Sequence, residues 1–103
     1  MPYEIVLTTE AVEDLRTLRA DLRVAVRQAL ETHLRHEPLK VSKSRIKRLR
    51  NLLSPQYRLR VDELRVFYDV KNDIVEVLAI VPKSETEAWL EQHGEADEGS
   101  NRE

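Results

Sequence analysis

The feature that most constrains the fold is a regular alternation of apolar and charged residues over 57–61. In Tyr57-Arg58-Leu59-Arg60-Val61 every second side chain is apolar, as expected for a β-strand with one buried and one exposed face. Only Asp62 and Glu63 separate this run from a second strand-like run over 64–70, which predicts a tight β-hairpin. The hairpin register would pair Arg60 with Arg65. One face would then be apolar, with Leu59, Val61, Leu64, Val66 and Tyr68, and the other would carry Arg58, Arg60 and Arg65.

The arginines on the second face predict a surface that binds phosphate. Like charges paired across two strands lie about 5 Å apart at Cβ and are destabilising unless an anion lies between them. The planar donor fork of arginine also matches phosphate oxygens. Residues 35–65 carry ten basic and three acidic side chains, although the whole chain has a net charge of −2. We therefore expect a nucleic-acid backbone as the ligand, the alternative being internal ion pairs with Glu76 or with the acidic C-terminal tail.

The flanking segments predict an α+β fold. Residues 3–7 read as a strand, and apolar residues at helical spacing over 9–34 predict two helices that form a hairpin, capped by Thr9 and Asp21, or one kinked helix. The basic segment 39–56 reads as a loop with a short strand near 46–49, and residues 74–81 complete a three-strand meander.

The C-terminal segment predicts a short helix and then a tail. Ser84 and Glu87 match a capping box, with Trp89 and Leu90 as anchors of the helix and Gly94 as its end. We expect one folded domain over residues 1–94 and an acidic, disordered tail over 95–103. Such a tail could fold back over the arginines and compete with phosphate.

The composition excludes several kinds of site. The absence of cysteine excludes disulfides and thiolate chemistry, and the two glycines, Gly94 and Gly99, cannot form a glycine-rich phosphate loop. His33 and His36 have no third ligand nearby in the sequence, so we expect no metal site and no cofactor. The apolar runs are too short to cross a membrane and no signal peptide is evident, which favours a cytoplasmic protein.

Taken together, the order of elements and three motifs resemble the RelE/ParE superfamily of bacterial toxins. The motifs are Lys47-Arg48-Leu49, Tyr57 to Val61 and Leu64 to Tyr68, and the resemblance covers residues 3–90. It implies a small, curved, antiparallel sheet, made of the N-terminal strand and the C-terminal meander, packed on an N-terminal helical hairpin. It also implies a type II toxin that an antitoxin protein holds inactive in a hetero-oligomer. RelE-like members cleave messenger RNA in the ribosomal A site without a metal ion.

The resemblance also implies roles for the basic residues. Arg58 and Arg60 correspond to basic residues near the scissile bond, Arg65 to the arginine that contacts the phosphate, and Lys83 keeps a positive charge at the end of the last strand. These four form the expected catalytic set. The residues expected to bind RNA are Lys43, Arg45, Lys47, Arg48 and Arg50.

The C-terminal segment departs from the RelE-like pattern. RelE-like nucleases usually have a glycine, then basic residues, then a tyrosine after the last strand. Here Ser84 or Glu85 stands where an arginine is expected, and Trp89 or Leu90 replaces the tyrosine. Arginine is a poor general base because it stays protonated, so the general acid and base remain unassigned, with Tyr57 or Tyr68 as possible substitutes. Three hypotheses follow: a RelE-like ribosome-dependent nuclease, a ParE-like gyrase poison, and a decayed module that only binds its antitoxin or RNA.

Overall fold

The structure is a computed structural model that describes residues 2–97. Its regular elements follow one another along the chain as β1 (Glu4–Leu7), α1 (Thr9–Arg16), α2 (Ala20–Ala29) with a π-helical turn (Leu30–Leu34), β2 (Ile46–Arg48), β3 (Leu52–Ser54), β4 (Tyr57–Val61), β5 (Leu64–Lys71), β6 (Ile74–Pro82), a 3₁₀ turn (Lys83–Glu85), α3 (Thr86–His93) and β7 (Glu95–Ala96).

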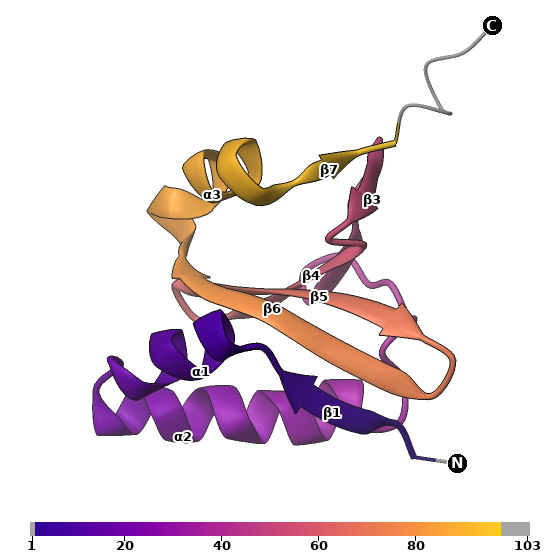
Figure 1. Ribbon diagram of the computed structural model, residues 1–103. Helices are drawn as coiled ribbons and strands as arrows, with labels where there is room; N and C mark the ends of the chain where they lie inside the picture. Colours follow the sequence, from indigo (N-terminus) through magenta and orange to yellow (C-terminus); the bar gives the residue numbers. More distant parts are fainter. Residues whose placement is uncertain (1, 98–103) are drawn as a thin grey trace, which may run out of the picture.

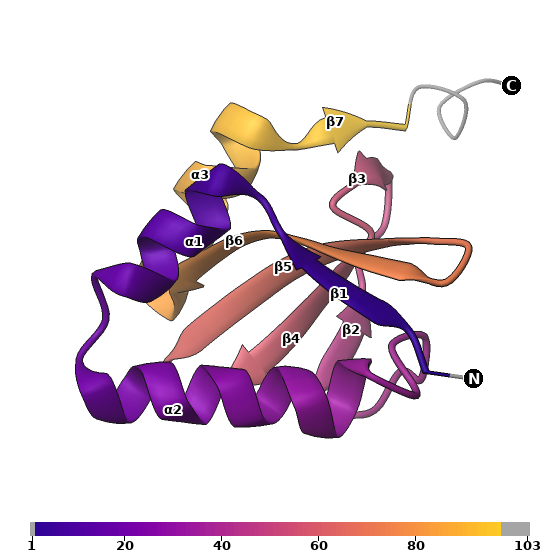
Figure 2. The ribbon, with the colours of Figure 1, turned by 60° about the horizontal axis from the view of Figure 1, so that its bottom comes forward.

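A five-stranded sheet with strand order β1-β6-β5-β4-β2 separates two layers. Helices α1 and α2 cover one face, and α3 lies over the opposite face together with the β3–β7 ribbon (Figure 1). The long helix α2 runs across the ends of several strands (Figure 2). The α+β fold, the helical hairpin and the short C-terminal helix are therefore confirmed.

The β4–β5 hairpin has the register that the alternation predicts. Arg60 pairs with Arg65 and Leu59 pairs with Val66, and the turn residue Asp62 has a φ of 52°, which suits a tight hairpin turn. Leu59 and Val66 are fully buried against the helices. Because side chains alternate between faces, the arginines of the hairpin are directed to the layer that holds α3.

The N-terminal strand corrects the prediction of an antiparallel sheet. β1 runs parallel to β6, with Ile5 opposite Val75, so the sheet is mixed. The meander β4–β5–β6 is antiparallel because tight turns join its strands, whereas no turn joins β1 to β6 and fixes their relative direction. The helix starts also differ slightly: Thr8 and not Thr9 caps α1, and Arg19 precedes α2 in place of Asp21.

The C-terminal segment differs from its prediction in two respects. The capping box does not form, because the 3₁₀ turn over Lys83–Glu85 places Glu85 before α3, and no side chain of Glu85 caps the helix. Glu95 and Ala96 form β7 against β3, so these two residues are not disordered. Gly94 ends α3 as predicted. Residues 98–103 of the predicted tail lie outside the described residues. Of the acidic residues expected to fold over the arginines, Glu95 lies in β7 and forms none of the ion pairs of residues 2–97, and the amide of Asp97 donates to the carbonyl of Asn51 (3.0 Å).

Side chains of α1 and of its N-cap residue replace the strand partner that β6 lacks beyond the end of β1. The hydroxyl of Thr8 donates to the carbonyl of Leu78 (3.0 Å), and the carboxylate of Asp14 accepts from the amide of Ile80 (2.9 Å). Burial raises the pKa of the Asp14 carboxyl, and repulsion from Glu10, Glu13 and Glu85 adds to the rise. Asp14 therefore anchors α1 to the sheet at an electrostatic penalty.

We expect this penalty to make stability depend on pH. The pKa of Asp14 is higher in the folded protein than in the unfolded protein, so above the ordinary carboxyl pKa the folded protein binds more protons than the unfolded protein. The contribution of Asp14 to the free energy of unfolding therefore decreases as pH rises. Asp14→Asn keeps an oxygen for Ile80 and removes the charge. Urea unfolding from about pH 4 to about pH 7 should show a smaller loss of stability in this variant than in the wild type. An identical slope in both proteins would contradict this account.

The buried Tyr68 is a second anchor, on the helix side of the sheet. It is fully buried, its ring stacks on Tyr57 with 5.4 Å between centroids, and its hydroxyl donates to the carbonyl of Pro38 (2.7 Å). Burial raises the pKa of the Tyr68 hydroxyl, which stays protonated as a donor. This contact ties the segment after the helices to β5.

Tyr68→Phe should lower the free energy of unfolding by about 1 to 2 kcal/mol, because the Pro38 carbonyl loses its donor. Tyr57→Phe is the matched control: it keeps the stacked pair and should change stability by less than about 0.5 kcal/mol. Chemical denaturation of the three proteins tests the difference. Equal stability of wild type and Tyr68→Phe would show that the hydrogen bond contributes nothing.

Candidate nucleic-acid interface

Arg65 is the most constrained cation of the charged face. It is 7% exposed, and one guanidinium nitrogen donates to the carbonyls of Asp62 and Leu64, both at 2.9 Å. Burial and the neighbouring charges of Arg58 and Arg60 lower the pKa of Arg65, although an arginine remains protonated. The backbone of the turn thus holds a buried positive charge close to two others.

Two pockets of about 270 Å³ each meet at these cations. Arg58, Arg65 and Lys83 line both of them, and we call these three residues the shared cations. The α3-side pocket is completed by Ser84, Thr86 and Glu87. The loop-side pocket is completed by Arg60 and by residues of the segment before β4, namely Lys43, Ser44, Arg45 and Lys47. The structure therefore brings together the four expected catalytic residues and three of the five expected RNA-binding residues.

Within the described part of the chain, no carboxylate forms an ion pair with the cations of these two pockets. The ion pairs within residues 2–97 are Arg16–Glu13, Arg19–Asp21, Arg35–Glu31 and Lys40–Glu37, and none of them involves a residue of either pocket. Glu76, the internal partner considered from the sequence, pairs with Asp69 across the strands and forms none of these ion pairs. No ion pair within residues 2–97 therefore neutralises the charge of these pockets.

The other two expected RNA-binding residues lie elsewhere. Arg48 pairs with Tyr57 across β2 and β4, its guanidinium lies 5.2 Å from the centroid of the Tyr57 ring, and it donates to the carbonyls of Leu49 and Gln56. Arg50 is exposed in the turn that follows β2 and lines neither pocket. The alternation of β2 explains the first difference, because it directs Lys47 and Arg48 to opposite faces.

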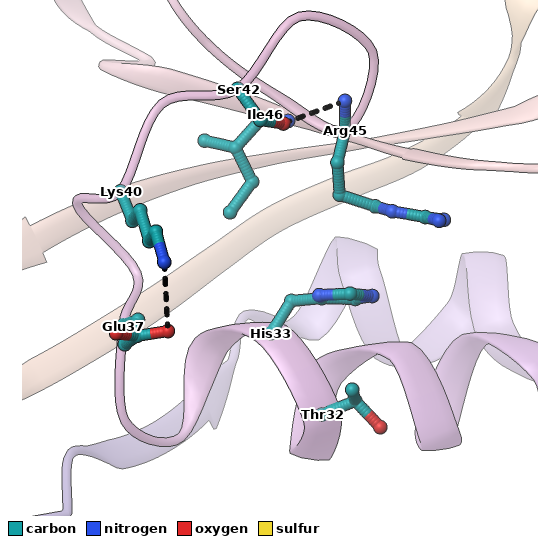
Figure 3. A pocket seen from close by; sticks show the side chains of 7 residues that line it. All are labelled: Thr32, His33, Glu37, Lys40, Ser42, Arg45 and Ile46. Carbon is teal, nitrogen blue, oxygen red and sulfur yellow. Dashed lines mark hydrogen bonds and ion pairs between the residues drawn. The ribbon is translucent and has the colours of Figure 1, made fainter.

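A third hollow continues the basic surface toward the helices. It lies between the π-helical turn and the segment 40–46, and its lining includes His33, Lys40 and Arg45 (Figure 3). Arg45 is shared with the loop-side pocket. Burial and the charge of Arg45 lower the pKa of His33, so this imidazole is neutral near pH 7. Within residues 2–97, His33 belongs to no group of three side chains that could hold a metal ion.

The α3-side residues are the part of the site that the sequence did not reveal. Ser84 and Glu87 read as a capping box, but Glu87 instead lines the pocket of the shared cations. Helix α3 is held on this face by Trp89, whose ring stacks on Phe67 with 4.9 Å between centroids and whose indole nitrogen donates to Glu10 (2.8 Å). The predicted anchor role of Trp89 is correct. Because Trp89 fixes α3 on this face, Glu87 in the first turn of α3 lies at the pocket, and the sequence pattern alone does not show this position.

The position of the tyrosines bears on the missing general acid and base. Tyr68 lies in the core on the helix side of the sheet, and Tyr57 stacks on it. Neither tyrosine lines a pocket of the shared cations.

No helix of the described residues is long and apolar enough to span a membrane.

Comparison with known proteins places this geometry in a family. A model of the ParE toxin of type II toxin-antitoxin systems matches residues 5–87. The toxin-antitoxin complex RelBE2 from Mycobacterium tuberculosis is similar, with 28% identity, a TM-score of 0.68, and coverage of 80% of this chain and 99% of that chain. The RelE–RelB complex of Pyrococcus horikoshii has 22% identity, a TM-score of 0.67, and coverage of 81% and 97%.

The isolated E. coli RelE toxin shares the fold at 16% identity, with a TM-score of 0.58 and coverage of 88% of this chain and 99% of that chain. No curated protein sequence matches the chain. Since the family model spans most of the sequence, and the fold agrees with that of the RelBE2 toxin, this chain belongs to the RelE/ParE superfamily of type II toxin-antitoxin toxins.

Proposed function

We propose that this toxin is a RelE-like, ribosome-dependent endonuclease that cleaves messenger RNA in the cytoplasm and so inhibits translation. The observation that carries the proposal is the set of shared cations, Arg58, Arg65 and Lys83, which line two adjoining pockets and form no ion pair with a carboxylate within residues 2–97. Like charges held together in this way are relieved by a bound polyanion. The further cations Lys43, Arg45 and Lys47 extend the positive surface along one side and would hold the neighbouring phosphates.

The cleavage of RNA by its own 2′-hydroxyl needs stabilisation of the charge that develops on the phosphate. Arg65 suits this role because two backbone carbonyls orient its guanidinium, so little reorganisation is needed when charge develops. Arg58 lies on the adjacent strand and can contact the same phosphate. Lys83 adds a third positive charge from the end of β6, where its backbone amide donates to the carbonyl of Glu63 (2.7 Å).

The natural inhibitor would be an antitoxin protein that covers this surface. The similar toxins of Mycobacterium tuberculosis and Pyrococcus horikoshii were solved in complex with their antitoxins. An antitoxin segment with several carboxylates would satisfy the shared cations and would exclude RNA from them. We therefore expect a toxin–antitoxin hetero-oligomer in which the toxin is inactive.

Substitution of Arg65 tests the proposed nuclease. Expression of the wild-type chain should stop translation and leave cuts within the codons of translated messages. Arg65→Ala should reduce cleavage by about 10²- to 10³-fold, because a donor to the charged transition state is lost. Arg65→Lys should recover little of it, because an ammonium lacks the planar fork. Arg19→Ala, which removes an exposed arginine on the helical hairpin, is the matched control and should cleave like the wild type.

Circular dichroism of the Arg65 variants would establish that they fold, since Arg65 is largely buried. Toxicity of the wild-type chain without any cut in RNA would refute the nuclease.

Poisoning of DNA gyrase is the second candidate function. The family model that matches the chain is that of ParE, and no tyrosine or histidine lines the pockets of the shared cations. A gyrase poison would induce a DNA-damage response and trap gyrase–DNA complexes, with messages left intact. Unchanged growth on expression would instead favour a decayed module that only binds its antitoxin or RNA.

A further inference from the structure

Glu87 is the one acidic side chain that lines the α3-side pocket. It lies in the first turn of α3, is exposed, and takes part in none of the ion pairs of residues 2–97. A carboxylate in the first turn of a helix is favoured by the helix dipole, which would account for an acidic residue somewhere in this turn. The dipole does not account for its position beside three cations.

The chemistry of the pocket lacks a proton acceptor without Glu87. Arginine and lysine side chains such as Arg58, Arg65 and Lys83 act as hydrogen-bond donors, and the hydroxyls of Ser84 and Thr86 are too weakly basic. Cleavage by the 2′-hydroxyl requires a group that removes its proton. A carboxylate is the side chain in this pocket that can do so.

We propose that Glu87 is the general base of the cleavage reaction, an inference that rests on the proposed nuclease function. The Glu87 carboxylate takes the proton of the 2′-hydroxyl, the 2′-oxygen forms a bond to phosphorus, and the bond from phosphorus to the 5′-oxygen breaks. The products are a 2′,3′-cyclic phosphate and a 5′-hydroxyl. The leaving 5′-oxygen takes its proton from the ammonium of Lys47, and solvent then restores both groups.

The arrangement of the two pockets suits this sequence of steps. In an in-line displacement the attacking and leaving oxygens lie on opposite sides of the phosphorus. Because the two pockets share Arg58, Arg65 and Lys83, a phosphate bound by these cations would border both the pocket lined by Glu87 and the pocket lined by Lys47. Lys47 pairs with Arg58 across β2 and β4, which keeps it next to that phosphate.

Three cations share the α3-side pocket with Glu87, namely Arg58, Arg65 and Lys83, and Glu85 precedes the same helix. A general base acts in its ionised form, so the cleavage rate should rise with pH until the base is fully ionised.

The test is single-turnover cleavage of a translated message by the purified chain on ribosomes, measured as a function of pH. Glu87→Gln should reduce the rate by about 10²- to 10⁴-fold and abolish its acid limb, while binding to the ribosome and message is retained. Glu91→Gln alters a carboxylate one turn further along α3 that lines neither pocket, and should match the wild type in rate and pH profile. Since both glutamates are exposed, neither change should unfold the protein.

The outcomes separate this inference from the function on which it rests. If the wild type cleaves and Glu87→Gln cleaves equally well with the same pH profile, Glu87 is not the base and the nuclease stands. If Glu87→Gln cleaves faster and binds RNA more tightly, Glu87 is a competing anion, which also overturns the inference. If the wild type leaves the message intact under all conditions, the proposed nuclease and the inference both fail.

Discussion

The structure depends on the way the β4–β5 hairpin divides its side chains between two faces. Burial of Leu59 and Val66 under the helices fixes the register, because a slip by one residue would move these apolar side chains to the other face of the sheet. The same register places Arg60 opposite Arg65. Hydrophobic burial on one face therefore holds the arginines close together on the other face, despite their mutual repulsion. The arginines thus take up these positions as the chain folds.

The repulsion is tolerated because the backbone compensates it locally. The carbonyls of Asp62 and Leu64, both 2.9 Å from the Arg65 guanidinium, solvate its charge without neutralising it. A carboxylate partner would stabilise the arginine more strongly, but it would also compete with phosphate for the same donors. The neutral acceptors leave the full charge of Arg65 for the phosphate ligand that we propose, at the expense of the extra stability that a carboxylate partner would give.

The sequence predicts the helices and strands whose apolar residues recur at a regular spacing. Alternation over 57–70 reveals β4, β5, their register and the arginine face, and helical spacing reveals the two N-terminal helices. The parallel direction of β1 and the β3–β7 pairing depend on contacts between distant segments, and Glu95-Ala96 has no strand propensity. Glu87 was missed for a similar reason: its spacing from Ser84 fits a cap, and only the packing of Trp89 on Phe67 shows where α3 lies.

The second, smaller core explains how the charged face can be partly covered and still hold an open site. Phe67, Ala79 and Val81 are apolar residues on the arginine side of the sheet, and Trp89 and Leu90 of α3 pack on them. These contacts lie over β5 and β6 and reach Arg65, which pairs directly with Val81 across the two strands. Since α3 is anchored to this core, the first turn of the helix, with Glu87, borders the pocket of the shared cations. Substitutions in α3 would thus change which side chains border the shared cations. The arginines of the β4–β5 hairpin, and with them the positive charge of the site, would stay the same.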